Sequence, residues 1–379
     1  MRKNLSIVTA GVLVFVCGVL CFPRQSMSQG GSEYVGSKTC GMCHPVVSKT
    51  WINHGHSKML RPIVNGKSPD NTDVKPPEGK TWNDLSYLAG GAYYYARFID
   101  SKGYVVTGPK AQWSMAGKSL TSFQPQSAPG TVKYDCIKCH VTGWKESGTY
   151  ANGVKNTLEG IPGAWYENGV GCESCHGMGS EHIALKNMAD IKKAKGDLKI
   201  KVDKSMETCG FCHQREEGKI SLAAKDLLES RQQYTEMKLN WKARTKMTCV
   251  SCHNPHASAL TKEGIVQTCE GCHTKIAVKI QSMASAGVKC LDCHMPFAAR
   301  GAYDSMVRAY SRGDTRSHIF GISLDPKYVL DDGTGHAALT DKGVARLTVE
   351  MTCYSCHKAG KSPDLSREKL FAEAMRVHK

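Results

Sequence analysis

The strongest constraint in this sequence is a five-residue pattern, Cys-x-x-Cys-His, that occurs eight times along 379 residues. The copies begin at Cys40, Cys136, Cys172, Cys209, Cys249, Cys269, Cys290 and Cys353. They use sixteen of the eighteen cysteines, and Cys17 and Cys21 lie in an apolar N-terminal stretch. Zinc sites and redox dithiols also use Cys-x-x-Cys, but neither needs a histidine directly after every pair. The repeated pattern therefore indicates covalent attachment of c-type haem, with the histidine as the proximal iron ligand.

The pattern predicts eight covalently attached haem c groups. Their attachment cysteines and proximal histidines are Cys40, Cys43, His44, Cys136, Cys139, His140, Cys172, Cys175, His176, Cys209, Cys212, His213, Cys249, Cys252, His253, Cys269, Cys272, His273, Cys290, Cys293, His294, Cys353, Cys356 and His357. So many porphyrins on so short a chain would supply much of the apolar core themselves. We therefore expect a mainly α fold with little regular secondary structure, in which short helical turns carry the motifs.

The N-terminal segment predicts export. A basic start, an apolar run over residues 5–22 and the tripeptide Ser26-Met27-Ser28 are typical of a secretory signal, here residues 1–28. The alternative is an uncleaved membrane anchor, because eighteen apolar or small residues are the short end of a spanning helix. Either reading places the chain outside the cytoplasm, periplasmic or at the cell surface.

The net charge of +16 would ordinarily suggest nucleic acid or an anionic membrane as a partner. Sixteen haem propionates change that argument, because with ferric irons and no signal peptide they leave a net charge of about +5. The lysines are then mainly counter-charges for propionates, and no nucleic-acid partner is predicted.

The spacing of the motifs divides the chain. We expect a tetrahaem half over residues 29–215, a linking helix over 216–248 and a second tetrahaem half over 249–379. The wide gap between the first two motifs contains aromatic and β-branched residues around Asp100 to Gly103, which predicts a small β insertion near residues 85–125. The C-terminal segment SREKLFAEAMRVHK predicts a short helix.

The histidines are too few for every iron to have two. Fifteen histidines minus the eight in the motifs leave seven candidates for distal ligands: His54, His56, His182, His256, His318, His336 and His378. At least one of eight irons must therefore have another ligand or an open site. A bis-His iron passes electrons, whereas an open iron can bind and reduce small molecules.

Residues 33–215 resemble the tetrahaem cytochrome c-554 family, and the whole chain loosely resembles the hydroxylamine oxidoreductase and pentahaem nitrite reductase group. The resemblance depends on CGMCHPVVSKTW with His56, on DCIKCHVTGW, on GVGCESCHGMGSEH and on CGFCH; CLDCHMPF and DTRSHIF extend it into the second half. It implies that His56 and His182 are distal ligands and that the haems stack in close pairs.

The resemblance also implies a five-coordinate iron at the second motif, so that Cys136, Cys139 and His140 mark a candidate open haem. His54 has no counterpart in the family pattern and is a candidate to cap this iron. Enzymes of the wider group mark their catalytic haem by a lysine in place of the motif histidine, or by a tyrosine cross-link. All eight motifs here end in histidine, so the lysine marker is absent.

Two functions are compatible with these residues. The first is an exported octahaem cytochrome that carries electrons between redox proteins, including an extracellular acceptor, as a single chain, a homo-oligomer or a filament. The second is a reductase or oxidase of a small nitrogen or sulfur compound, such as nitrite, hydroxylamine or tetrathionate, at the haem that lacks a distal histidine. The missing lysine marker favours electron transfer over catalysis. A membrane partner is predicted only if the signal is not cleaved.

Overall fold

The structure is a computed structural model of the chain. It describes residues 31–69, 73–185, 188–193, 197–240, 247–301, 305–307, 310–357 and 365–379. The predicted signal peptide lies outside these residues. No helix in the described part combines the length and apolarity that crossing a bilayer requires.

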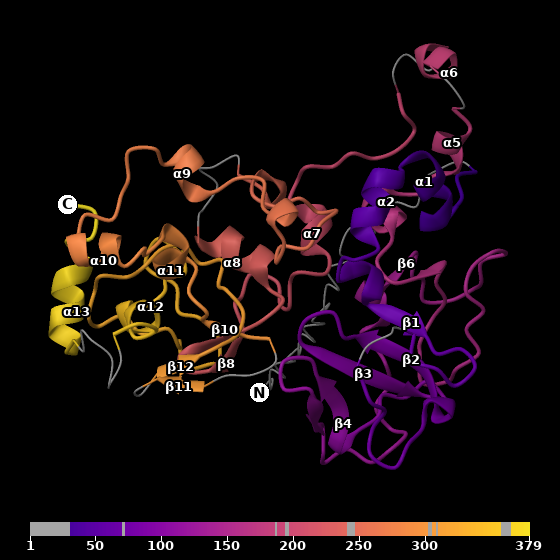
Figure 1. Cartoon of the computed structure of the whole chain (residues 1–379), viewed down its shortest axis with the longest axis horizontal. Helices are drawn as coiled ribbons and strands as arrows, with labels where there is room; N and C mark the ends of the chain where they lie inside the picture. Colours follow the sequence, from indigo (N-terminus) through magenta and orange to yellow (C-terminus); the bar gives the residue numbers. More distant parts are fainter. Residues whose placement is uncertain are drawn as a thin grey trace, which may run out of the picture.

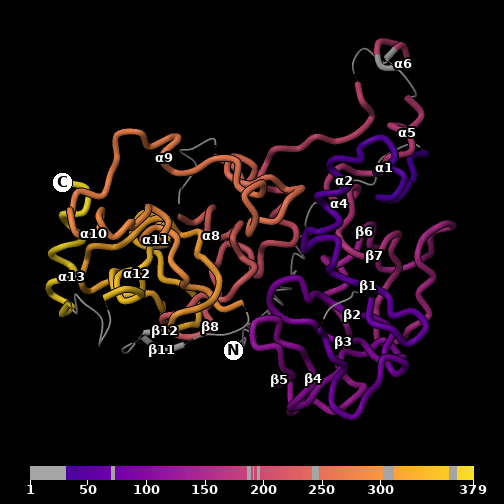
Figure 2. Tube along the Cα trace, in the orientation of Figure 1, coloured from indigo at the N-terminus to yellow at the C-terminus, as the bar shows by residue number. Residues whose placement is uncertain are grey.

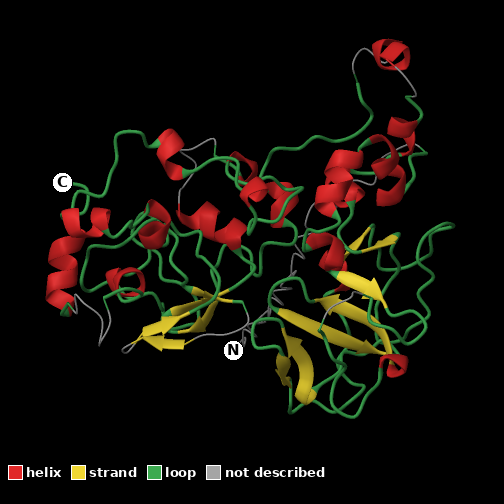
Figure 3. Cartoon of the chain, viewed as in Figure 1, coloured by secondary structure: helices red, strands yellow, loops and turns green. Residues whose placement is uncertain are grey.

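Short helices and strands are joined by long loops throughout the molecule (Figure 3). The first half of the chain, coloured indigo to magenta in Figure 1, lies beside the second half, coloured orange to yellow. The expectation of a fold with little regular secondary structure is confirmed.

Each motif begins on or beside a short helical turn. These turns are α1 (Ser37–Cys43), α3 (Ile137–His140), α4 (Cys172–His176), α7 (Glu207–Gly210), η3 (Cys249–Ser251), α9 (Cys269–Cys272), α11 (Cys290–His294) and α12 (Val349–Cys353). One helical turn places the two cysteines and the histidine on neighbouring positions of one surface. The remaining helices are α2 (Pro45–Trp51), η1 (His56–Lys58), η2 (Trp82–Asp84), α5 (Ser180–Ile183), α6 (Met188–Lys193), α8 (Gln233–Asn240), η4 (Lys262–Gly264), α10 (Gln281–Ser285) and α13 (Arg367–Ala374).

The predicted β insertion is a five-stranded antiparallel sheet in the order β1-β2-β3-β4-β5. Its strands are β1 (Leu60–Pro62), β2 (Leu85–Gly90), β3 (Tyr95–Asp100), β4 (Gly108–Ser114) and β5 (Ser119–Phe123). After β3 the chain turns where Asp100 Oδ1 accepts hydrogen bonds of 2.9 Å from the backbone N–H groups of Lys102 and Tyr104. The sheet includes β1 and so begins before the predicted start near residue 85.

Alternation of side chains along the strands gives the sheet two apolar faces. Leu88 and Phe98 are fully buried in one cluster with Trp113. The neighbouring Ala89 and Ile99 point into a second cluster that contains Ile137, the residue after the first cysteine of the second motif. The sheet therefore forms the support on which the second motif rests.

The remaining strands are short. Val141–Thr142 (β6) pairs with Glu167–Asn168 (β7), and β8 (Leu222–Ala224), β9 (Leu227–Glu229) and β10 (Ala299–Arg300) form a three-stranded sheet. Ser305–Val307 (β11) and Tyr310–Arg312 (β12) form a hairpin.

The prediction of one linking helix over 216–248 is wrong for the residues before Gln233, and residues 241–246 lie outside the described part. Leu222 and Leu228 face each other in the β8–β9 hairpin, and β9 pairs with β10 in parallel. Arg231 then has a left-handed φ of 63°, which a continuous helix does not allow. Leu227 and Leu228 are both fully buried, which an amphipathic surface helix would not require. Only the 8-residue helix α8 remains.

The predicted C-terminal helix is confirmed as α13. The Ser366 side chain accepts a hydrogen bond from the backbone N–H of Lys369 and so caps its start. Leu370 of α13 packs against Val349 and Tyr354 of the segment that carries the eighth motif. On the other side of the molecule, α5 and α6 stand out from the body on an arm (Figure 2).

Candidate functional site: paired histidines along a series of motifs

Five of the motif histidines lie opposite a second histidine from a distant part of the chain. Their ring centroids are 6.0 to 6.2 Å apart. The pairs are His44 with His182, His213 with His56, His176 with His256, His253 with His318, and His294 with His378. His56 and His182 lie on the single helical turns η1 and α5, and the other three partners lie in loops or at the chain end. Such short elements give no signal in helical or strand periodicity.

These separations fit one metal ion between two imidazoles. A metal–imidazole bond is about 2 Å and the ligating nitrogen is about 1 Å from the ring centre, so two axial rings have centroids about 6 Å apart. The interplanar angles range from 7° to 61°. This range is compatible with axial ligation because each ring can rotate about the shared axis.

The hydrogen bonds of the rings favour the same arrangement. A nitrogen that ligates a metal must be unprotonated, and a hydrogen bond from the other nitrogen fixes that tautomer. Nδ1 of His176 and of His182 donate to backbone carbonyls of the arm, those of Lys201 and Leu198, at 2.7 Å. Nδ1 of His294 donates to Phe320 O at 2.7 Å. In each of these rings, Nε2 is left for the metal.

Burial keeps the deeper rings neutral. It lowers the pKa of His56 to about 3 and the pKa of His318 to about 4. At neutral pH both imidazoles are therefore uncharged, which is the form that binds metal. The residues present thus fit haem iron at these five motifs.

Contacts between cysteines show which motifs are neighbours. The thiols of three pairs lie close enough to affect each other's pKa strongly: Cys40 with Cys172, Cys139 with Cys212, and Cys209 with Cys249. Weaker electrostatic effects on thiol pKa values link Cys175 with Cys209, Cys252 with Cys269, Cys290 with Cys269, and Cys353 with Cys293. The motifs therefore follow one another in the order 1-3-4-5-6-7-8, and the second motif branches from the fourth.

Two carboxylates, the buried Glu173 and the partly buried Glu167, hold the first and third motifs together. Glu173, in the third motif and 3 % exposed, accepts hydrogen bonds from the backbone N–H groups of Val35, Gly36 and Gly179. Glu167 accepts from the Ser37 hydroxyl at 2.8 Å. These contacts fasten the segment before α1 to the start of α4.

A third carboxylate supports the partner of the fifth motif. Glu236 is 1 % exposed, and its Oε2 accepts from the backbone N–H of His318 at 2.5 Å and from the Ser317 hydroxyl at 3.3 Å. Burial raises the pKa of Glu236 to about 7. The short helix α8 thereby positions His318 opposite His253.

The second motif has a different environment. His140 Nδ1 is 2.5 Å from Tyr134 Oη, and the Tyr134 side chain is buried. Burial and the positive charges of Arg231 and Arg97 lower the pKa of His140 to about 4. Arg97 donates to Gln112 Oε1 at 3.1 Å and stacks on Phe123, so the sheet fixes its position. No motif spacing or periodicity in the sequence marks Tyr134, Arg97 or Arg231 as site residues.

Two of the seven candidate histidines do not face a motif histidine within the described residues. His54 lies beside His56, with ring centroids 4.4 Å apart, so it is on the side of the fourth motif. Both ring nitrogens of His336 are engaged, Nδ1 with Thr334 at 2.9 Å and Nε2 with Glu216 at 2.8 Å. Among the described residues, no second imidazole stacks on His140 or His273.

Comparisons with known proteins indicate the class of protein. Residues 109–177 match the family described as cytochrome c554 and c-prime, and residues 242–278 match a doubled CXXCH motif. The chain is a multihaem c-type cytochrome. It carries multiple covalent haems and contains a cytochrome c554 family domain.

Curated relatives of this cytochrome differ in their described roles. Multiheme cytochrome MtrA of Shewanella baltica is 22 % identical over 61 % of this chain and 54 % of its own length. Dissimilatory sulfite reductase MccA of Wolinella succinogenes is 23 % identical over 80 % of this chain and 57 % of its own length. Cytochrome c-554 of Nitrosomonas europaea is 23 % identical over 54 % of this chain and 70 % of its own length. The cytochrome thus spans little more than half the length of the first two relatives.

Two solved structures share the fold. The octaheme sulfite reductase MccA of Wolinella succinogenes superposes with a TM-score of 0.54 at 17 % identity, over 93 % of this chain and 72 % of that one. The outer cell wall cytochrome OcwA superposes with a TM-score of 0.50 at 20 % identity, over 77 % of this chain and 80 % of that one. The fold therefore serves both a reductase and a cell-wall cytochrome.

Proposed function

We propose that this cytochrome carries a haem at each of its eight motifs and is an exported electron carrier. The observation that supports this most strongly is the set of five imidazole pairs 6.0 to 6.2 Å apart. Haem c with two axial imidazoles supplies reversible one-electron chemistry. Filled axial sites exclude substrate, so most of the chain is suited to passing charge.

The protein's own residues support a continuous route. Because the cysteines of successive motifs are neighbours, the attached groups would meet edge to edge along the order 1-3-4-5-6-7-8. The second motif, whose Cys139 lies beside Cys212 of the fourth, would form a side branch. Redox proteins, or an extracellular acceptor, would exchange electrons at the two ends of this series.

Export is part of the proposal. The apolar N-terminal segment supports it, and so does the likeness to a cytochrome whose name places it in the outer cell wall. Thioether attachment of haem c also requires a compartment in which the cysteines meet haem after translocation.

Electron paramagnetic resonance of the oxidised protein tests the proposal, together with the intact mass. We expect a mass increase for eight haems and a spectrum dominated by low-spin iron. A mass increase for five haems or fewer, or a mainly high-spin spectrum, would contradict an electron-carrier chain.

One observation at the second motif favours a second function. Two positively charged side chains, Arg97 and Arg231, act electrostatically on His140, and Arg97 is largely buried. Such a site attracts small anions, and one relative is named a dissimilatory sulfite reductase. The alternative is therefore reduction of a small oxyanion at the second motif.

Steady-state assays separate the two functions. With reduced methyl viologen as donor, we expect no turnover of sulfite, nitrite or hydroxylamine above that of free haem. Turnover that is abolished by Arg97→Gln, with an unchanged haem count, would instead establish the reductase.

A further inference from the structure

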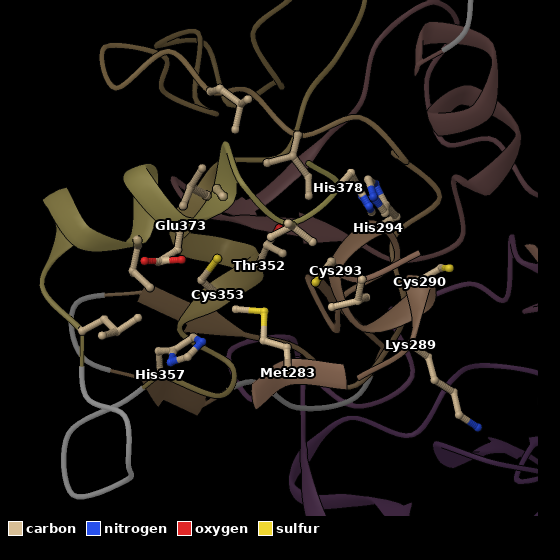
Figure 4. Close-up of a pocket in the computed structure, with 18 residues that line it drawn as sticks. Met283, Lys289, Cys290, Cys293, His294, Thr352, Cys353, His357, Glu373 and His378 are labelled. Atoms are coloured by element: carbon tan, nitrogen blue, oxygen red, sulfur yellow. The ribbon is translucent and has the colours of Figure 1, made fainter. Parts of the chain in front are cut away.

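The seventh and eighth motifs share one cavity in the second half of the molecule. The space there that protein atoms do not fill is about 900 Å³, and part of it is open to solvent. Cys290 and Cys293 of the seventh motif line it, as do Cys353 and His357 of the eighth (Figure 4).

The seventh motif already has both axial imidazoles. His294 and His378 lie together at one side of the cavity in Figure 4, with ring centroids 6.0 Å apart. His357 enters the cavity from another direction. The two remaining non-motif histidines are committed elsewhere, His54 beside His56 and His336 between Thr334 and Glu216. No histidine is therefore left for the side opposite His357, so an iron there has either a ligand of another residue type or an open site.

Met283 presents the one soft donor, other than the motif cysteines, among the residues that line this cavity. It belongs to α10, whose other residues are exposed, whereas Met283 is partly buried. In Figure 4 its sulfur points into the space between Cys353 and Cys293, on the side of the cavity that His357 faces. A thioether sulfur is a known axial ligand of haem iron.

The other polar side chains of the lining are less suited. Lys289 points away from the cavity in Figure 4. Glu373 is paired with Arg376 at 3.2 Å. Thr352 has only a neutral hydroxyl, which is a weak ligand for haem iron.

We propose that Met283 Sδ is the distal ligand of the iron at the eighth motif, opposite His357. This rests on the proposed loading of that motif with haem. Methionine in place of a second imidazole raises the reduction potential of haem iron. The last site in the series would thus have a higher potential than its bis-His neighbours, and electrons entering at the other end would collect there.

Met283→Leu tests the ligand, because leucine keeps the volume and apolarity of the side chain but removes the sulfur. Met375→Leu is the matched control, since Met375 is half exposed and does not line the cavity. We expect the oxidised wild type and the control to show the red charge-transfer absorption of a sulfur–ferric iron bond. In Met283→Leu this band should disappear, and one iron in eight should become high-spin.

Met283→His provides a second, independent readout. A second imidazole should keep that iron low-spin without the sulfur band, and the highest potential in a spectroelectrochemical titration should fall. The intact mass of each variant shows whether the eighth haem is attached. Eight haems with no sulfur band in the wild type, or with a band that persists in Met283→Leu, would overturn the assignment of Met283 while leaving the electron-carrier function in place. Absence of the eighth haem from the wild type would overturn the assignment of Met283 and the proposed loading of all eight motifs, but not the electron-carrier function.

Discussion

His176 and His256 lie face to face, with ring centroids 6.0 Å apart and ring planes inclined by only 7°. The two residues come from different halves of the chain, and His256 follows the fifth motif while His176 completes the third. One iron between these rings would join the two halves more firmly than the surrounding loops do. Haem attachment and the tertiary fold are therefore coupled, because each of the five imidazole pairs joins segments that are far apart in the sequence.

Replacing a partner histidine should open one iron. In His256→Ala the ring opposite His176 is gone, so we expect one new high-spin ferric signal in the electron paramagnetic resonance spectrum. His336→Ala is the control, because both nitrogens of His336 are bonded to Thr334 and Glu216. A high-spin signal of equal size in both variants would contradict the pairing.

Glu173 should be important for stability. Its carboxylate accepts hydrogen bonds from the backbone N–H groups of Val35, Gly36 and Gly179. In Glu173→Ala these buried donors lose their acceptor, so we expect the free energy of unfolding to fall by about 2–4 kcal/mol. Denaturant unfolding of the haem-loaded protein measures this. The exposed Glu181 offers a control, and a loss as large in Glu181→Ala would show that the effect does not come from the network.

Glu236 should act on the iron of the fifth motif through His318. Glu236→Leu leaves the His318 N–H and the Ser317 hydroxyl without their buried acceptor, so we expect a loss of about 1–3 kcal/mol in unfolding free energy. We also expect a high-spin fraction as His318 is released. Glu236→Gln retains an oxygen acceptor and should remain low-spin. A Gln variant that is as high-spin as the Leu variant would argue against this positioning role.

Tyr134 should tune the second motif. A hydrogen bond from His140 Nδ1 to Tyr134 Oη makes the imidazole a stronger electron donor to its metal. In Tyr134→Phe we expect a weaker iron–histidine bond, visible as a lower stretching frequency in the resonance Raman spectrum, and a higher potential for that haem. Tyr94→Phe, whose hydroxyl contacts Thr315 on the surface, should change neither. An unchanged stretching frequency in Tyr134→Phe would mean that the bond does not reach the metal.

Local patterns predicted the parts of the fold that depend on neighbouring residues. The β insertion was visible in alternating aromatic and β-branched residues, and α13 in its serine cap and helical period. The linking helix failed because the same apolar residues suit a buried hairpin. Leu228 packs against Ala298 and Ala299, which lie far along the chain and leave no local trace.

The sequence by itself determined where haem is attached, because two cysteines and a histidine within five residues define both thioethers and the proximal ligand. It also determined that the histidines are too few to cap every iron. Only the tertiary structure decided which residue faces each motif. It placed the penultimate histidine, His378, opposite His294, left His336 in a surface network, and turned Met283 toward the eighth motif. The physical reason is that a proximal ligand is held by the covalent chemistry of its own turn, whereas a distal ligand comes from whichever segment folds across the opposite face.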